Sequence, residues 1–353
     1  MTEFAPAVTG FGVSLGENRI SNQLYGEMTG VDPAWIGDRT GIGTRYWADP
    51  QTHTVEMAIL ASRDALLMAG LTAEDLNLIE LATSTPKWPG ASTVADIHAG
   101  LGASARCRVM QFPAACAGGG MSLEEVSDKI TLHGGVALAI GAERLSSVIN
   151  LADRTTGPLF SDAAGAAVVE LVEGATPPIF TGETHPAREI LGIHSGGTFR
   201  ATEGEDDPLG KIAMEGGPVF RYAVDIMPRL AREVAEADGA YNLHTGIDWD
   251  RYTAFVPHPG SGRIARQVCD LLKVPEKKRF TTINEHGNAS AASLFLGLQK
   301  AHEAGAFDDD ENTRVLSSYM GAGILAGAGA YNVRPRRGPR VQKVLGIASL
   351  SLL

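Results

Sequence analysis

The sequence predicts an α/β fold, and two observations carry that prediction. Apolar runs typical of strands alternate with segments of helical periodicity along the 353-residue chain, which indicates strands joined by helices. The 42 glycines cluster where the predicted strands end, at positions that need tight turns and close backbone approach. The chain is also long enough for two packed halves, each with a sizeable core.

The predicted elements follow one another at short intervals. Each strand is an apolar run that ends at glycine, proline or a polar turn, and each helix shows a repeat near 3.6 residues. In chain order we expect strands over 78–86, 136–145, 163–174, 253–260, 314–323 and 323–333, and helices over 92–102, 121–134, 263–273 and from about 290. A short strand-like run, TTI (281–283), precedes the last helix.

The second half of the sequence echoes the first. Thr85 and His258 each follow a strand and lie 173 positions apart, and Cys116 and Asn288 each precede a helix and lie 172 apart. Because these anchors keep one order, we expect two similar halves packed together. The alternative is that Gly- and Ala-rich strand ends look alike by chance.

Composition and charge exclude several classes of function. The net charge is −11 and no long basic run occurs, so we expect no nucleic-acid partner. Three cysteines are too few for a disulfide framework, and none has metal-ligand spacing, so we expect no metal. The N-terminus lacks a basic segment, and the final apolar run of 10 residues is short of the roughly 20 that span a bilayer. We therefore expect a cytoplasmic protein without a membrane partner.

The segment QFPAACAGGGMSLEEV (111–126) raises the first candidate for chemistry. A thiol at a helix N-terminus is exposed to unsatisfied N–H groups, which favour the thiolate. The glycines at 118–120 are expected to clear space around the sulfur for a large thioester. The alternative for Cys116 is a small buried hydrophobic residue, which is the usual state of a free cysteine.

Two further residues stand at similar junctions. His258 ends an apolar strand between two prolines, where ligand sites are common, although a single histidine at a turn is more often solvated or capping. Asn288 precedes the helix SAASLFLGL and is either its N-cap or a donor to a developing negative charge. Together Cys116, His258 and Asn288 make a nucleophile, a base and an electrostatic partner, a set that requires no metal.

The segments PAACAGG, VPHPGSGRI and INEHGNASAAS, in that order and spacing, resemble the ketoacyl-ACP synthase III family of the thiolase superfamily. The resemblance implies a thiolase-like fold of two βαβαβαββ halves in a five-layer αβαβα sandwich, and a homodimer. It implies an N-terminal half over 1–175 with the nucleophile, a C-terminal half over 176–333 with the histidine and asparagine, and an extension over 334–353.

The same resemblance implies roles for individual residues. Cys116, His258 and Asn288 match the catalytic triad, and the backbone N–H groups of Cys116 and Ala322 match the oxyanion hole. The other matches are expected to bind substrate: Trp35, Arg39 and Arg154 at the CoA adenine end, Phe220 at the tunnel entrance, and Trp88 reaching the partner's acyl pocket. Gly260 and Ser261 depart from the family's pattern, and as small residues they are expected to widen the mouth of the substrate site.

The implied activity is an acyl transfer through a cysteine thioester, with acyl-CoA or acyl-carrier protein as donor substrate and no permanent cofactor. Two departures shape our expectation of the second step. Pro-Gly-Ser follows His258 where the family usually has Gln-Ala-Asn, and Asp270 and Leu271 stand where it often has lysines for docking an acidic carrier protein.

We therefore expect an acyltransferase of the kind found in polyketide pathways. It would pass its acyl group, malonyl among the candidates, to a hydroxyl or amine of a small acceptor such as a polyketide glycoside. The alternative is decarboxylating condensation with malonyl-ACP, and a third is a non-catalytic partner subunit.

Overall fold

The computed structural model describes residues 4–187, 190–193, 210–308 and 313–336. Its main sheet contains β1 (Phe4–Leu15), β4 (Leu78–Ala82), β5 (Arg108–Phe112), β6 (Val136–Glu143), β7 (Ala163–Glu173), β8 (Ile179–Thr184), β13 (Ala254–Pro257), β14 (Arg314–Gly321) and β15 (Leu325–Val333). The larger helices are α3 (Thr54–Ala69), α4 (Ser92–Leu101), α5 (Gly118–His133), α6 (Gly216–Ala237), α7 (Gly262–Leu271) and α9 (Ser293–Glu303). These bounds confirm the predicted alternation of strands and helices to within a few residues.

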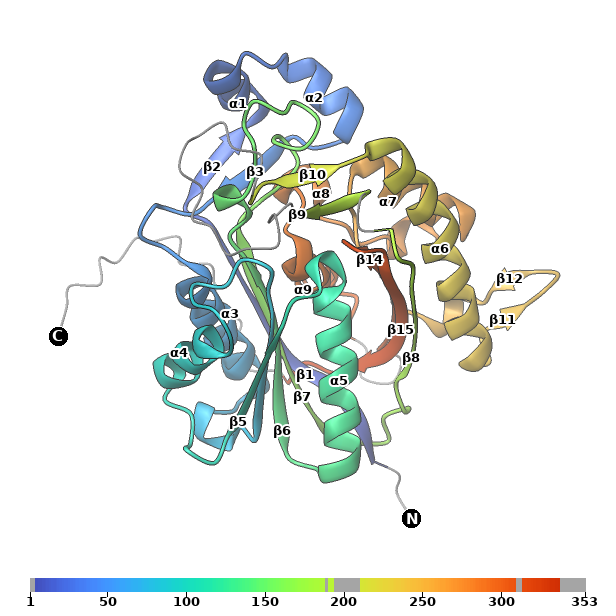
Figure 1. The fold of residues 1–353 in the computed structure, drawn as a ribbon. Coiled ribbons are helices and arrows are strands. Elements are labelled where there is room, and N and C mark those ends of the chain that lie inside the picture. Colours follow the sequence, from blue (N-terminus) through green and yellow to red (C-terminus); the bar gives the residue numbers. More distant parts are fainter. Residues whose placement is uncertain (1–3, 188–189, 194–209, 309–312, 337–353) are drawn as a thin grey trace.

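Several smaller helices and strands lie outside the main sheet (Figure 1). They are the antiparallel pair β2 (Asn18–Ser21) and β3 (Thr44–Trp47), the helices α1 (Asn22–Thr29), α2 (Pro33–Thr40) and α8 (Ile283–His286), and the pairs β9 (Leu191–Ile193) with β10 (Ile212–Met214) and β11 (Tyr241–Asn242) with β12 (Gly246–Ile247).

The two halves follow the same order of elements, except that the second half has no strand between α7 and α9 in the position of β5. The first half runs β1-α3-β4-α4-β5-α5-β6-β7, and the second runs β8-α6-β13-α7-α9-β14-β15. The strand expected at 281–283 is wrong: only an isolated bridge joins Phe255 to Arg279, and Ile283 already begins α8. The backbone of His286 donates to the carbonyl of Thr282, so the chain coils there instead of extending.

The strands of both halves form one mixed sheet in the described part of the chain, in the order β13-β14-β15-β1-β7-β6-β4-β5, with β8 paired on β15. The halves meet where β1 runs parallel to β15, over the pairs Ala7–Asn332 and Val8–Val333. This contact is short, whereas β1 and β7 pair along their whole length. The predicted two halves are therefore joined edge to edge as well as packed together.

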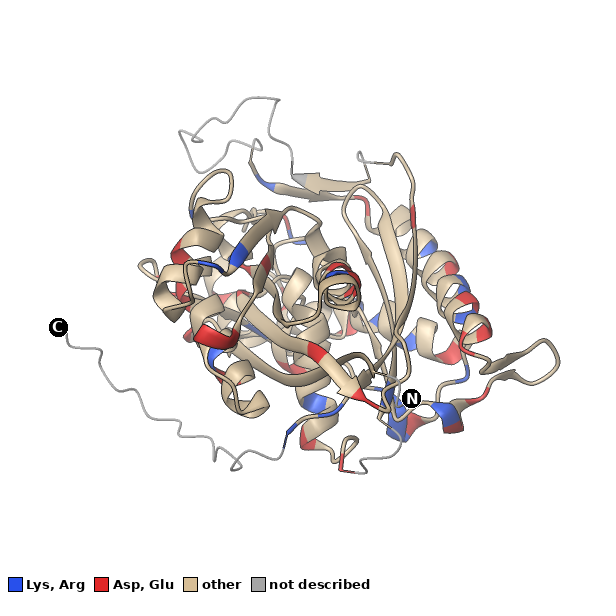
Figure 2. Ribbon diagram, turned by 90° about the horizontal axis from the view of Figure 1, so that it is seen from below, with Lys and Arg blue, Asp and Glu red and all other residues tan. Residues whose placement is uncertain are grey.

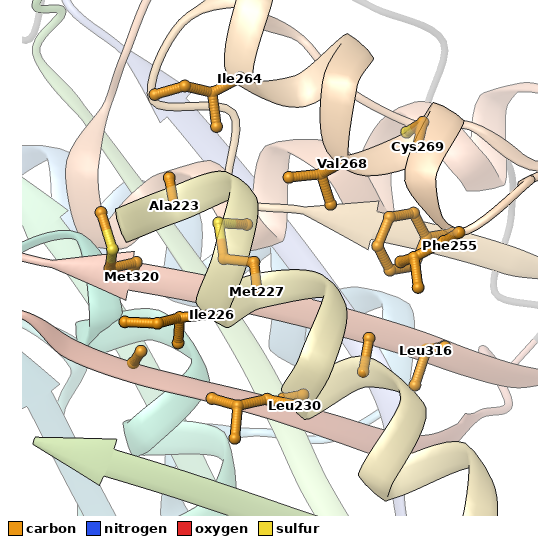
Figure 3. Close-up of a cluster of buried hydrophobic side chains, with 14 of the residues drawn as sticks. Ala223, Ile226, Met227, Leu230, Phe255, Ile264, Val268, Cys269, Leu316 and Met320 are labelled. Carbon is orange, nitrogen blue, oxygen red and sulfur yellow. The ribbon is translucent and has the colours of Figure 1, made fainter. Parts of the chain in front are cut away.

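Three buried clusters of side chains define the layers. One packs α3 and α4 on β4, β6 and β7, a second places α5 and α9 between the strands of the two halves, and a third packs α6 and α7 on β13 to β15. Figure 3 shows the third cluster, in which Ala223, Ile226, Met227 and Leu230 of α6 face Leu316 and its neighbours on the sheet. The resulting sequence of helix, strand, helix, strand and helix confirms the five-layer α/β fold.

Positively and negatively charged residues are interspersed along the described chain. Figure 2 shows Lys and Arg positions lying among Asp and Glu positions across the ribbon. None of the helices within the described ranges is long and apolar enough to cross a membrane.

Of the predicted extension, residues 337–353 lie outside the described residues. The first part of it is held on the fold: the Arg334 backbone donates to the Val8 carbonyl at 2.7 Å, and Arg336 pairs with Glu170 at 2.8 Å.

Candidate active site

Cys116 lies in a tight turn, Ala115–Ala117, that leads directly into α5. Ala115, the residue before it, has φ +45°, a left-handed conformation that non-glycine residues seldom adopt. Its backbone N–H is held by the hydroxyl of Ser84 at 3.2 Å. The turn carries Cys116 at the helix start, as predicted, and part of the residue's surface remains exposed although its thiol is desolvated.

The glycines that follow Cys116 have a different role from the one we expected. Gly118, Gly119 and Gly120 are all buried. A Cβ on Gly119 would lie 2.3 Å from the carbonyl oxygen of Ala291, and one on Gly120 would lie 2.0 Å from the ring of Tyr319. They do not clear space for a thioester, because protein already fills that space. They let α5 pack closely against the second half of the chain.

His258 follows β13 and is buried, with 6% of its surface exposed. Its backbone N–H donates to the carbonyl of Ser318 on β14 at 2.7 Å. Burial lowers the pKa of the imidazole to about 4, because an apolar environment disfavours the charged form. Among the described residues, none forms a hydrogen bond with its Nδ1. The side chain is therefore a neutral imidazole at neutral pH.

Asn288 is fixed by hydrogen bonds on all sides. Its backbone N–H donates to the carbonyl of Leu159 and its carbonyl accepts from Ser161, each at 2.9 Å. The side-chain Oδ1 accepts from the backbone N–H of Ser290 at 2.9 Å, and Nδ2 points to the carbonyl of Gly260 at 3.4 Å. Asn288 thus bridges toward the loop that follows His258, while Ala292 holds the cap position of α9.

The three candidate residues come from different elements: the turn before α5, the end of β13 and the turn before α9. Hydrogen bonds from Ser290 and Asn288 to the Cys116 sulfur favour its thiolate, and the negative charge of Glu143 disfavours it. Burial is the largest effect and raises the pKa of the thiol to about 11. A backbone hydrogen bond at Cys116 lowers the pKa, as expected of a helix start, but desolvation outweighs it.

The backbone at the end of β14 lies against the Cys116 turn. A Cβ on Gly321 would lie 2.7 Å from the nitrogen of Ala117, 2.9 Å from the oxygen of Ala114 and 3.0 Å from the nitrogen of Cys116. Ala322, the predicted second member of an oxyanion hole, is the next residue and is partly exposed. The two backbone segments that the prediction pairs are thus adjacent.

The predicted substrate-binding residues fall into separate groups. The guanidinium of Arg154 lies over the ring of Trp35 at 5.4 Å, so two of the three expected CoA contacts are together, and Arg39 is in the last turn of the same helix as Trp35. The guanidinium of Arg263 lies over the ring of Phe220 at 5.8 Å. These pairs are exposed enough to meet a ligand from solvent.

The remaining predicted contacts are placed differently. Gly260 has φ +53°, and the hydroxyl of Ser261 caps α7 by accepting from the backbone of Ile264 at 3.3 Å. Ser261 therefore has a local structural partner already. Trp88 lies in the loop after β4, 49% exposed, and its indole N–H donates to Asp96 at 2.9 Å.

Sequence reasoning missed a buried carboxylate beside the site. Glu143 is the last residue of β6 and is fully buried. It accepts from the backbone of Ser84 and from the hydroxyls of Thr85 and Ser290. The signal was present as a charged residue at the end of the apolar run VALAIGAE. Within the described ranges no group of three or more His, Cys, Asp or Glu side chains is suited to hold a metal ion.

Comparison with known proteins identifies relatives along nearly the whole chain. Residues 110–184 match the family described as 3-oxoacyl-[acyl-carrier-protein] synthase III, and residues 244–333 match the C-terminal part of that family. The chain is 33% identical over 336 residues to acetoacetyl CoA synthase NphT7 of Streptomyces sp. strain CL190, covering 92% of this chain and 98% of the relative.

Two solved structures extend the likeness to the fold. The 3-oxoacyl-[acyl-carrier-protein] synthase III from Aquifex aeolicus VF5 has a TM-score of 0.82 and 30% identity, with 93% of this chain and 100% of the other covered. The priming β-ketosynthase from the R1128 polyketide biosynthetic pathway has a TM-score of 0.81 and 29% identity, with 95% and 98% covered.

Proposed function

Because the chain belongs to the 3-oxoacyl-[acyl-carrier-protein] synthase III family of the thiolase superfamily, we propose that it is a condensing enzyme. It would join an acyl group held on Cys116 to a malonyl thioester with loss of CO2. The relatives reported above are named as synthases or ketosynthases, which supports this alternative over the expected transfer to a hydroxyl or amine of a glycoside acceptor.

One structural observation carries the proposal. The Asn288 side chain is linked to the loop after His258 through the carbonyl of Gly260, and hydrogen bonding from Asn288 lowers the pKa of the Cys116 thiol against the larger effect of burial. The backbone of Gly321 completes the surroundings of the nucleophile. A thiol and an amide donor beside the loop that follows a buried imidazole suit thioester chemistry.

In the first step the Cys116 thiol would attack the carbonyl carbon of the acyl donor. Both groups are neutral at rest, since the pKa of the thiol is raised and that of His258 is lowered, so the imidazole can take the thiol proton as attack proceeds. Backbone N–H groups of Cys116 and Ala322 would stabilise the tetrahedral oxyanion. The donor thiolate leaves with that proton, and the acyl group remains as a thioester on Cys116.

In the second step a malonyl thioester would lose CO2, and the electron pair of the broken bond would form a thioester enolate. The N–H of neutral His258 and the amide of Asn288 are the donors available to the enolate oxygen. The enolate carbon then attacks the acyl carbonyl and displaces the Cys116 thiolate, which takes up a proton. The products are a 3-oxoacyl thioester, CO2 and free enzyme.

The outer face of α7 bears on which carrier brings the malonyl group. Arg263 and Arg266 are exposed, whereas Asp270 pairs with Arg279 at 2.8 Å and Leu271 is exposed and apolar. Such a face steers an acidic carrier protein less strongly than a row of lysines would. This supports malonyl-CoA as an extender alongside malonyl-carrier protein.

The deciding experiment supplies the enzyme with acetyl-CoA and isotope-labelled malonyl-CoA or malonyl-carrier protein in separate arms. We expect one CO2 released for each 3-oxoacyl product formed. Malonyl transfer to an added hydroxyl acceptor, without release of CO2, would support the acyltransferase alternative instead. Full activity of the Cys116→Ala variant in either reaction would contradict both.

We further propose that the protein is a homodimer joined at β5. This strand is the edge of the sheet, and Val109 and Met110 are each 37% exposed there. An open apolar edge is a template for pairing with a second copy. Light scattering should give a dimer for the wild type and a monomer for Met110→Arg; a wild-type monomer at micromolar concentration would contradict the proposal.

A further inference from the structure

The buried carboxylate of Glu143 lies where three loops of the site meet. It stands at the carboxyl end of β6, between the loop after β4 and the turn before α9. A fully buried carboxylate is costly unless it is well hydrogen-bonded. Burial raises its pKa to about 7, and the hydrogen bonds it accepts limit that rise.

The first link of Glu143 leads to the Cys116 turn. Its carboxylate oxygens accept from the backbone N–H of Ser84 at 3.1 Å, and one also accepts from the hydroxyl of Thr85 at 2.6 Å. These bonds fix the loop so that the hydroxyl of Ser84 meets the N–H of Ala115. Ala115 is held in a left-handed conformation, which requires such an external constraint.

The second link leads to Asn288 and to the sulfur. The hydroxyl of Ser290 donates to Glu143 at 3.3 Å and also lies within hydrogen-bonding reach of Cys116. Ser290 is left-handed too, with φ +49°, and its backbone N–H holds the Oδ1 of Asn288. One carboxylate thus holds Ser290 directly and Ala115 indirectly, through Ser84. Ala115 immediately precedes Cys116, and Ser290 lies two residues after Asn288.

We propose that Glu143 is a positioning residue that fixes Cys116 and Asn288 relative to each other through Ser84 and Ser290. The inference rests on the proposed function, in which Cys116 is the nucleophile. Glu143 belongs to the first half of the chain and Ser290 to the second, so this hydrogen bond also helps to fix the position of one half relative to the other. Residues that lock the geometry of reacting groups affect turnover more than substrate binding.

The chain offers a matched control. Glu80 is also fully buried, on the neighbouring strand β4, but it pairs at 2.9 Å with Lys129 near the C-terminal end of α5, whereas Cys116 precedes the N-terminal end. Glu143→Gln and Glu80→Gln therefore remove the same charge from equally buried places. Both are expected to lower the unfolding temperature, and only Glu143→Gln is expected to alter the chemistry.

Three measurements test the proposal on the full chain: kcat and KM for condensation, the rate of acyl-enzyme formation, and the pH dependence of Cys116 alkylation by iodoacetamide. In Glu143→Gln we expect kcat to fall about tenfold with KM within about twofold, and the alkylation midpoint to move to lower pH because a nearby negative charge is gone. In Ser290→Ala kcat should also fall, but the midpoint should rise because a donor to the thiolate is lost.

The outcomes separate this proposal from the one on which it rests. Wild-type kcat and an unchanged midpoint in Glu143→Gln, or equal effects in Glu80→Gln, would overturn it. Should Glu143→Gln fail to fold, Ser84→Ala and Ser290→Ala break one link each, and wild-type rates in both would overturn it equally. If the wild type forms an acyl-enzyme but does not condense, the proposed function fails, while acylation and alkylation rates still decide the role of Glu143.

Discussion

The backbone of Gly321 lies directly against the backbone nitrogen of Cys116, so that a Cβ on Gly321 would stand only 3.0 Å from it. Gly321 ends β14 in the second half of the chain, and Cys116 precedes α5 in the first. The surroundings of the proposed nucleophile are therefore built by both halves, and neither half holds the site alone.

This contact predicts the effect of Gly321→Ala. The new methyl group would overlap the backbone of the Cys116 turn, and backbone cannot rotate away as a flexible side chain can. We expect acyl-enzyme formation to slow by at least about tenfold. Intact-protein mass spectrometry at successive times after mixing with acetyl-CoA measures that rate. Gly216→Ala is the control, because its nearest neighbour is the end of Met214 at 4.0 Å. Equal rates in both variants would contradict the expectation.

A second prediction concerns Asn288→Ala. Loss of the amide removes a donor proposed for the enolate, so condensation should fall by about 10²–10³-fold, while acylation of Cys116 falls much less. Separate assays of acyl-enzyme mass and of CO2 release distinguish the two steps. The control is Asn284→Ala, an exposed residue of α8. Parallel loss of both steps in Asn288→Ala would assign the amide to acylation instead.

A third prediction follows from the buried imidazole. The pKa of His258 is lowered from its ordinary value of 6.5 to about 4 by burial, so the unfolded chain binds more protons between these values. The free energy of unfolding should therefore fall as pH decreases from 6.5 toward 4, by about 3 kcal/mol from this residue. Urea denaturation should show that the difference in free energy of unfolding between wild type and His258→Gln narrows as the pH decreases through that range. A difference that stays constant would refute the lowered pKa of His258.

The pair of Trp35 and Arg154 gives a fourth prediction. If they hold the nucleotide end of CoA, Trp35→Ala should raise KM for acetyl-CoA several-fold and leave kcat nearly unchanged, since a remote binding contact is lost. An acetyl thioester of N-acetylcysteamine, which lacks the nucleotide, should react equally with both proteins. A similar loss with both donors would show that Trp35 acts on the fold rather than on CoA.

Much of the fold follows from patterns that can be read locally. The apolar runs at 136–145 and 163–174 form β6 and β7. The spacing that relates His258 to Thr85 and Asn288 to Cys116 reflects the similar order of elements in the two halves. The run at 281–283 misled, because three β-prone residues do not make a strand when the following N–H groups find partners within their own turn.

The residue types of the candidate site could be predicted from the sequence, but their burial, contacts and pKa shifts could not. Local composition was enough to predict that Cys116 and His258 follow strands and precede helices, and that Asn288 precedes a helix. Residues distant in the chain account for the rest: the desolvation of the thiol, the packing role of the glycines beside it, and the positions of Glu143 and Gly321. Burial and contact depend on residues far away in the chain, and pKa and geometry follow from those contacts.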